Sequence, residues 1–338
     1  MSDPSENRDA AVSAGLRYVT DQQPGISRLG SKGRFRYRLP SGKIVRDRAV
    51  LKRIKSLVIP PAWTDIWISP QPNSHLQATG RDARGRKQYR YHPDFAAIRD
   101  SVKYAHLIDF AKSLPDLRRR LKRDLKRAGL PREKILAAIV TLLEETLIRV
   151  GNEDYARNNR SFGLTTLRNR HVKVRGGEIG FLFKGKSGKE WSLSLRNKRV
   201  AKIIRSCQDL PGQHLFEYRG EEGSIRSVSS SDVNAYLKEI SGRDITAKDF
   251  RTWAGTVKAA ISFSTFSGTV SKKAARTIVA EVAEELGNTI AVCRKCYIHP
   301  AIFAGFEDGN LRLRLPRRGR DELSPAEIAV FHYLRRHP

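Results

Sequence analysis

The chain has few cysteines. Its 338 residues include only Cys207, Cys293 and Cys296, too few for a disulfide framework, so we expect a reducing compartment. Two residues separate Cys293 from Cys296, a spacing that also occurs in metal and redox sites. A closed zinc site needs about four ligands, however, and the sequence has no second pair of this kind. We therefore interpret the three residues as ordinary thiols.

Long apolar segments are also missing. The longest apolar stretch, residues 135–150, is interrupted by Glu144, Glu145 and Arg149 and is shorter than the ~20 residues that cross a membrane. The first residues, up to about Gln23, are polar and mixed in charge, without the apolar run of a signal peptide. We expect an intracellular, cytoplasmic protein that is not anchored in a membrane.

Acidic residues are scarce relative to basic ones. There are 35 Asp and Glu against 64 Lys and Arg, which gives a net charge of +29. This balance is typical of a protein that neutralises backbone phosphates, although acidic substrates and anionic membrane surfaces also fit. Taken alone, it also allows a non-catalytic, architectural DNA-binding protein.

The length predicts two domains. A polar segment, residues 1–27, is expected to be flexible. Residues 28–92 contain short alternating stretches broken by turn residues, which predict a small antiparallel sheet. Between Arg28 and Lys55 the chain has eleven basic residues and only Asp47 to oppose them, with two aromatic residues interleaved. Aromatic rings among cations add stacking and cation–π surface, so we expect a β-rich DNA-binding domain.

A basic segment near the end of this domain is the strongest binding candidate. Residues 81–91 read RDARGRKQYRY. Arginine and glutamine can read base edges through paired hydrogen bonds, and lysine can contact phosphates. A basic hairpin that only aids solubility is the alternative. The candidate DNA contacts are Arg84, Arg86, Lys87, Gln88, Tyr89 and Tyr91.

We place the domain boundary at His92-Pro93, which disfavours continuation of a helix or a strand. Residues 93–338 are expected to be mainly helical. Leucines at 114, 117, 121 and 125 predict a helix with one apolar and one basic face. Residues 135–148 are apolar nearly all round and predict a buried helix with Arg149 at its end. Taken alone, Arg149 fits either a structural ion pair or a phosphate ligand.

Three short strands interrupt the helical pattern at residues 171–174, 178–183 and 190–195. The second turn between them carries Lys184, Lys186 and Lys189. A flexible ammonium at the tip of a hairpin can protonate a leaving alkoxide as general acid. The spacing alone does not choose among the three lysines.

Further helices follow this sheet. Thr246 and Asp249 resemble a capping box that opens a helix to about Phe263, with Arg251 in its electropositive first turns. A helix over residues 271–286 ends at a glycine and is followed by Asn288, whose side chain either caps a helix or donates to a phosphate. Tyr297 comes nine residues later. The sequence from Ser324 predicts a terminal helix.

Five segments occur in one order: IRVGNEDY, NRSFGLTTLRNRHV, FLFKGKSGKEW, KDFRTWAGT and LGNTIAVCRKCY. From about Arg28 to about Phe303 the chain resembles the compact, poxvirus-like type IB DNA topoisomerases. GRKQY resembles the segment with which the small domain of that family reaches a DNA groove. The expected fold is α+β: a small N-terminal antiparallel β-sheet domain followed by a mainly α-helical catalytic domain with an inserted three-stranded β-sheet. The resemblance implies a monomer that forms a clamp around double-stranded DNA, and we expect it at a bacterial nucleoid.

The resemblance also implies a mechanism for supercoil relaxation. Tyr297 would attack a phosphodiester to give a 3′-phosphotyrosyl enzyme and a free 5′-hydroxyl, and religation would reverse the step. Arg149, Arg251 and Asn288 would neutralise the transition state, and the FKGK match selects Lys186 as the general acid. Because the phosphotyrosyl ester stores the energy of the broken bond, no ATP and no metal cofactor are expected.

The sequence departs from part of this family at Asn288, where histidine is often found. Asparagine can donate a neutral hydrogen bond but cannot supply a proton, so less pH dependence is expected from this position. Tyrosine recombinases are the closest alternative, since LGNTIAVCRKCY also resembles their nucleophile segment. Their second arginine usually follows a histidine three residues before it, where this chain has Lys248.

Overall fold

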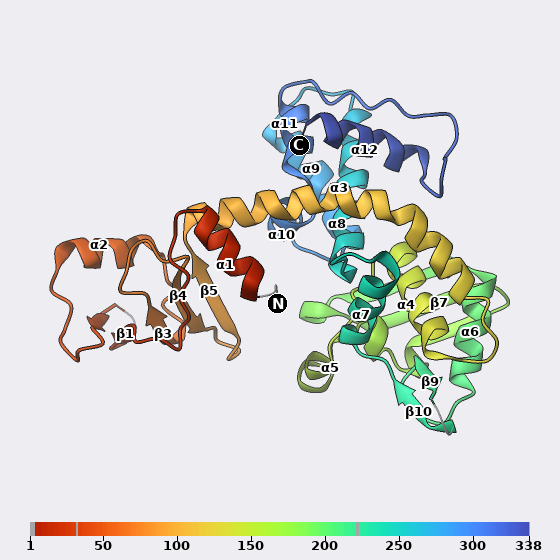
Figure 1. Cartoon of the computed structure of the whole chain (residues 1–338), viewed down its shortest axis with the longest axis horizontal. Coiled ribbons are helices and arrows are strands. Elements are labelled where there is room, and N and C mark those ends of the chain that lie inside the picture. The colour runs from red at the N-terminus through yellow and green to blue at the C-terminus, as the bar shows by residue number, and fades with distance from the viewer. Residues whose placement is uncertain (1–3, 32, 221–222, 338) are drawn as a thin grey trace. The chain divides into compact units, whose positions relative to one another are not determined.

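The computed structural model describes residues 4–31, 33–220 and 223–337. The chain divides into two compact units, 1–105 and 106–338. The division falls inside helix α3 (Pro93–Asp124), which begins immediately after the last strand of the first unit (Figure 1). The α+β class expected from the sequence is confirmed.

The first unit contains a five-stranded antiparallel sheet in the order β2-β1-β3-β4-β5. Its elements are α1 (Pro4–Ser13), β1 (Ile26–Leu29), β2 (Arg36–Arg38), α2 (Arg48–Ser56), β3 (Thr64–Ile68), β4 (Leu76–Arg81) and β5 (Lys87–Tyr91). One core cluster joins the sheet to α2 through Ile26, Ile54 and Ile68. Because β5 is an edge strand, the basic segment singled out in the sequence has an exposed position.

The second unit is mainly helical, with an antiparallel sheet β6-β7-β8 inserted in it. Its helices are α4 (Arg132–Thr146), α5 (Glu153–Asn159), α6 (Lys198–Gln208), α7 (Ser230–Ser241), α8 (Ala247–Ser264), α9 (Lys272–Glu285), α10 (Ile290–Cys296), α11 (Pro300–Glu307) and α12 (Pro325–Arg336). Its strands are β6 (Val172–Arg175), β7 (Glu178–Lys184), β8 (Glu190–Arg196), β9 (Glu217–Arg219) and β10 (Ile225–Ser227). The helix starts at Thr246 and Ser324 confirm the two predicted capping signals.

One predicted helix end is wrong. Helix α4 stops at Thr146, and Leu147 has a left-handed backbone with φ of 58°. Arg149 therefore lies in an irregular segment after the helix rather than at its end. A smaller difference concerns His171, which belongs to a 3-10 turn before β6 instead of to the strand.

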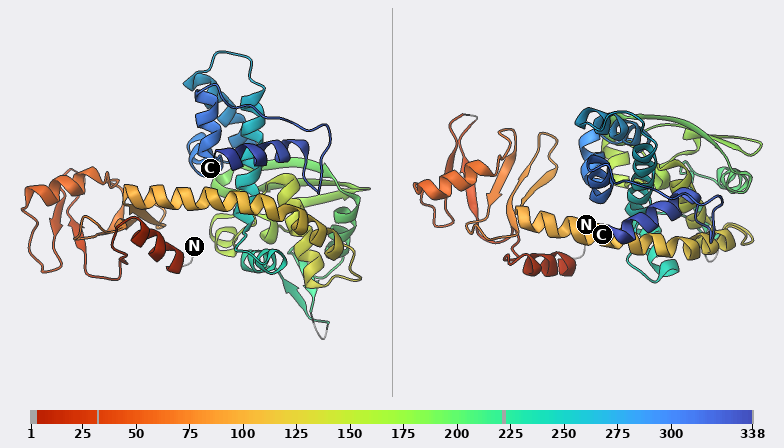
Figure 2. Two further views of the ribbon diagram at one scale, coloured as in Figure 1. Left: turned by 45° about the horizontal axis from the view of Figure 1, so that its top comes forward. Right: turned by 90° about the horizontal axis from the view of Figure 1, so that it is seen from above.

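Helix α12 packs against α8, as both views in Figure 2 show. Its buried residues include Ala329, Val330 and Leu334, which lie on one face of the helix. The terminal segment is thus part of the packed second unit. None of the helices in the described part of the chain is long and apolar enough to cross a lipid bilayer.

Candidate active site

Arg251 lies in the first turns of α8 and is almost completely buried, with 3% of its surface exposed. Its Nη2 donates to the carbonyl of Leu286 at 2.7 Å, and its Nη1 donates to the carbonyl of Leu147. These carbonyls belong to the C-caps of α9 and α4. The guanidinium carbon lies 5.3 Å from the centroid of the Tyr297 ring. The two helix ends thus hold a buried cation beside the candidate nucleophile.

Arg149 reaches the same place from the segment after α4. The carbonyl of Arg149 accepts a hydrogen bond from Leu164 N at 2.9 Å. A Cβ on Gly163 would lie 2.5 Å from that carbonyl, so the two segments can approach this closely only because residue 163 is a glycine. The Arg149 side chain donates through Nη2 to the carbonyl of Gly287 at 3.0 Å and to Oδ1 of Asn288. Segments IRVGN and SFGLTT therefore pack together to place this guanidinium.

Asn288 follows the glycine that ends α9. Gly287 is left-handed, with φ of 59°, and Asn288 N donates to the carbonyl of Ala283 at 2.8 Å. The next helix, α10, is capped by Thr289, whose hydroxyl accepts from Val292 N at 3.3 Å. The side chain of Asn288 is therefore not the cap that the sequence left as an alternative.

Two buried donors in this cluster have no hydrogen-bond partner among the described residues. They are Nδ2 of Asn288 and Nε of Arg251. Buried donors in folded proteins are nearly always satisfied, and an unpaired one costs about 1–3 kcal/mol. An acceptor-rich anion bound beside Tyr297 would satisfy both donors.

The electrostatics of the cluster favour the same kind of ligand. Burial lowers the pKa of Arg251 to about 10, an effect that Tyr297 opposes and the neighbouring Arg149 reinforces. Burial also lowers the pKa of Arg149, and Tyr297 again opposes the shift. Across the described ranges, neither arginine forms an ion pair with a carboxylate. A buried cation next to a half-buried one, with no counter-ion, is costly, and a bound anion offsets that cost.

Tyr297 follows α10 and packs against α8. A Cβ on Gly255 would lie 2.6 Å from the Tyr297 carbonyl, so this contact requires a glycine within the helix. Arg251 and Gly255 are four residues apart and therefore lie on one face of α8. Thr256 Oγ1 donates to the Tyr297 carbonyl at 3.4 Å and accepts from His299 N at 3.1 Å. Gly255 and Thr256 were not predicted from the sequence as site residues, although a glycine inside a helical pattern usually has a packing reason.

Lys186 is the one predicted catalytic residue that the structure does not bring into this cluster. It is exposed in the turn between β7 and β8. The same hairpin lies beside the end of α9, because Trp191 contacts the Gly287 position and Lys189 Nζ donates to the carbonyl of Glu284 at 2.7 Å. Lys189 is thus engaged elsewhere, while Lys186 stands at the tip of a hairpin next to the cluster.

The residues around Lys186 also fit a nucleotide-binding pattern. Residues 180–187, GFLFKGKS, match the spacing GxxxxGK[ST] of a phosphate-binding loop. That loop must follow a strand and open a helix. Here Gly180 to Lys184 all belong to β7, the middle strand of the sheet β6-β7-β8, and each pairs with a residue of β8. The match is therefore a coincidence of spacing.

Comparison with known proteins gives the family. The model of the eukaryotic DNA topoisomerase I catalytic core matches residues 92–310, and that of the bacterial DNA topoisomerase IB N-terminal domain matches residues 34–82. The chain belongs to the type IB DNA topoisomerases. This type IB topoisomerase is 35% identical over 259 residues to DNA topoisomerase 1B of Acanthamoeba polyphaga mimivirus, covering 73% of the chain and 77% of that protein. It is 23% identical over 276 residues to DNA topoisomerase 1B of vaccinia virus (strain Copenhagen), covering 78% and 84%.

Membership defines the activity at the level of the family. The topoisomerase acts on DNA and relaxes it by strand cleavage and religation. The catalytic-core match ends at residue 310, so α12 lies beyond it.

The candidate DNA contacts of the topoisomerase lie on a hairpin formed by β4 and β5. The carboxylate of Asp82 accepts hydrogen bonds from the backbone N of Arg84 at 2.9 Å and of Arg86 at 3.0 Å. It also accepts from Arg86 Nε at 2.8 Å and from Gln88 Nε2 at 2.9 Å. The hydrogen bond from Arg86 holds the pKa of Asp82 at about 2. Asp82, which the sequence analysis did not single out, therefore organises the turn.

The hairpin divides the six candidates of the topoisomerase between faces. Lys87, Tyr89 and Tyr91 alternate along β5 and are exposed on one face, and the Tyr89 and Tyr91 rings stack with centroids 5.9 Å apart. Gln88 lies on the opposite face with Asp82. Arg84 is exposed at the turn. The six side chains therefore do not all lie on one face of the hairpin.

Proposed function

We propose that this topoisomerase cleaves one DNA strand by attack of the Tyr297 hydroxyl oxygen on a backbone phosphorus. The P–O bond to the 5′ oxygen breaks, which leaves a 3′-phosphotyrosyl enzyme and a free 5′-hydroxyl. Religation runs the same step backwards. The observation that carries the proposal is the pair of unpaired buried donors, Arg251 Nε and Asn288 Nδ2, in a cluster with Tyr297 and two cations.

Each group has a role that follows from its chemistry. Arg149 and Arg251 neutralise the charge that grows on the phosphoryl oxygens, and Asn288 donates a neutral hydrogen bond. The guanidinium carbon of Arg251 lies 5.3 Å from the centroid of the Tyr297 ring, so a positive charge stands beside the attacking residue. Lys186 delivers the proton to the leaving 5′ oxygen, for which its long side chain at a hairpin tip is suited.

The covalent intermediate also determines the cofactor requirement. The phosphotyrosyl ester is exchanged for a phosphodiester without loss of bond energy, so we propose that relaxation needs neither ATP nor a metal ion. The test is relaxation of plasmids of both supercoil signs in EDTA without nucleotide, with the covalent adduct trapped by denaturation. Full relaxation together with trapped adduct is expected. A strict requirement for ATP or Mg²⁺ would overturn the proposal.

For DNA binding we propose a monomer that closes around the duplex as a clamp. Residues 28–92 form its DNA-binding domain and residues 93–338 its catalytic domain. The described part of the segment before them contains α1 and the first residues of β1. The candidate contacts Arg84, Arg86, Lys87, Gln88, Tyr89 and Tyr91 belong to the first of these domains. We also propose a cytoplasmic location at the nucleoid. Sedimentation of the protein with a short duplex tests the monomer, since a 2:1 complex would contradict it.

A further inference from the structure

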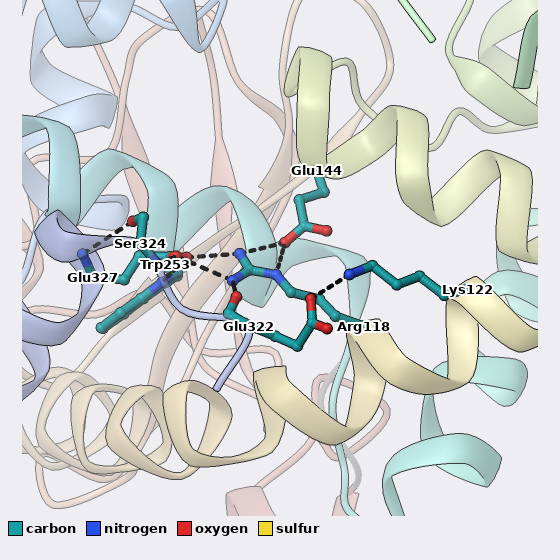
Figure 3. Close-up of polar contacts among 7 residues, drawn as sticks. All are labelled: Arg118, Lys122, Glu144, Trp253, Glu322, Ser324 and Glu327. Atoms are coloured by element: carbon teal, nitrogen blue, oxygen red, sulfur yellow. Dashed lines mark hydrogen bonds and ion pairs between the residues drawn. The ribbon is translucent and has the colours of Figure 1, made fainter. Parts of the chain in front are cut away.

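A cluster of buried ion pairs joins four helices of the second unit (Figure 3). Arg118 of α3 stands at its centre. Its Nε donates to Glu144 of α4 at 2.8 Å, and its Nη2 and Nη1 donate to the two carboxylate oxygens of Glu327 of α12 at 2.7 and 3.1 Å. The side chains of Arg118 and Glu327 are 18% and 11% exposed. The bidentate, desolvated ion pair between Arg118 and Glu327 has a fixed geometry.

Glu327 connects this cluster to the helix that carries Arg251. Its Oε1 also accepts a hydrogen bond from Trp253 Nε1 of α8 at 3.1 Å. Trp253 is two residues after Arg251, so the two side chains leave α8 in roughly opposite directions. One side of α8 therefore faces the active-site cluster, and the other is fixed to α12 and, through Arg118, to α3.

Glu144 links the same cluster to α4. Helix α4 ends two residues after Glu144, at Thr146, and the carbonyl of its C-cap Leu147 accepts from Arg251. The segment after that cap carries Arg149. The Arg118–Glu144–Glu327 cluster therefore holds both helices from which the two active-site arginines are positioned.

Helix α12 also contacts the helix that follows the nucleophile. The Tyr333 hydroxyl donates to the carbonyl of Ala301 in α11 at 3.4 Å, and a Cβ on Gly305 would lie 2.0 Å from that hydroxyl. Helix α11 begins three residues after Tyr297. Helix α12 is thus in contact with helices on both sides of the active-site cluster, although it lies beyond the region that the catalytic-core model matches.

We propose that Glu327 is a positioning residue for the transesterification, which acts by fixing α8 against α3 and α4 so that Arg251 meets the scissile phosphate. This inference rests on the proposed phosphotyrosine mechanism. Helix α12 belongs to the catalytic apparatus of this protein although none of its residues contacts the reacting atoms.

A double-mutant cycle tests the proposal. Glu327→Gln keeps the shape of the side chain but removes the charge that Arg118 binds. We expect it to slow formation of the denaturation-trapped adduct on plasmid DNA by roughly 10- to 10²-fold, the scale for a misplaced catalytic group, with DNA affinity unchanged. In an Arg251→Lys background the same change should alter the rate by less than about 2-fold, because the residue through which Glu327 acts is already displaced.

Val330→Ala is the matched control. It removes buried methyl groups from the same helix without touching the ion pairs, so it lowers the melting temperature and should leave the adduct rate near that of the unaltered protein. If Glu327→Gln does not fold, Trp253→Phe removes the Nε1 donor of α8 together with part of the buried indole, and it is expected to give the same dependence on Arg251.

Three results would overturn the inference: an unaltered rate in Glu327→Gln, equal slowing in both Arg251 backgrounds, or equal slowing by Val330→Ala at a matched loss of stability. Failure of the underlying mechanism is distinguishable. Adduct that persists in Tyr297→Phe contradicts the proposed function itself, whereas adduct lost in Tyr297→Phe but formed at full rate in Glu327→Gln contradicts only the role of α12.

Discussion

Arg118 and Arg251 are both largely withdrawn from water, but their surroundings are opposite. Arg118 is bound by two carboxylates, and these raise its pKa against the effect of burial. Arg251 has carbonyl partners instead, and burial, reinforced by the nearby cation of Arg149, lowers its pKa to about 10. Around Arg118 the protein itself supplies the counter-charge, so the cation serves the fold. Around Arg251 that charge is missing, which is the arrangement expected where a ligand supplies it.

The strongest test of this comparison is to remove the nucleophile and leave the cations. Tyr297→Phe should abolish the covalent adduct and relaxation, because only the attacking oxygen is lost. DNA affinity should stay within about 2-fold, since the cations that attract phosphate remain. Denaturing gels report the adduct, and filter binding at fixed salt reports affinity. Adduct on another residue of the variant would place the nucleophile elsewhere.

Lys186 is the cation that the structure leaves outside the cluster. Lys186→Ala should slow cleavage by roughly 10²- to 10⁴-fold, the usual contribution of a general acid. At a cleavage site mapped by adduct trapping, most of the deficit should disappear on a substrate with a 5′-thiolate leaving group, which needs no proton. Lys184→Ala is the matched control on the same hairpin. An equal deficit with both leaving groups would exclude Lys186 as the acid.

The contrast between Arg118 and Arg251 is tested most directly by the stability of two matched variants. Arg118→Met leaves Glu144 and Glu327 buried without a cation and should cost about 3–5 kcal/mol of unfolding free energy. Arg251→Met removes an uncompensated charge and should cost less than half as much, while abolishing efficient cleavage. Thermal melting of both variants beside Arg119→Met, an exposed neighbour expected to change little, decides the matter. Equal losses for the two buried arginines would refute the distinction.

Replacement of Asn288 should have the smallest of these effects, and it tests a single hydrogen bond to the phosphate. If its unpaired Nδ2 donates to a phosphoryl oxygen, Asn288→Ala should lower the single-turnover cleavage rate by roughly 10²-fold, as for loss of one transition-state donor. Asn288→His should retain much of the activity. A fully active but less stable alanine variant would mean that Asn288 serves only the fold through its contact with Arg149.

Local signals in the sequence were sufficient for much of the fold. The Thr246–Asp249 spacing predicts the start of α8 and hence the location of Arg251, because a capping box depends only on residues within one turn. The glycine after α9 and the strand pattern around Lys186 are also signals that depend only on residues close together in the sequence. The order of the five segments then indicated the family.

Other features could not be predicted because they depend on contacts distant in sequence. Leu147, which follows α4, has a left-handed backbone that its surroundings stabilise, and a leucine does not predict that conformation. The pairing of Arg118 with Glu327 spans 209 positions. Even the hydrogen bond between Arg149 and Asn288, which contradicts the capping alternative, needs two segments 139 residues apart to be brought together.

The carbonyl groups that hold Arg251 have a consequence for the conditions under which the site stays assembled. Backbone carbonyls do not titrate, so acid cannot release the guanidinium from Leu147 and Leu286 as protonation would release it from a carboxylate. Being neutral, they also do not compete with a phosphate for the charge of the arginine. The enzyme thus has a cation that acid does not release from its partners and whose charge remains available to a phosphate when DNA arrives.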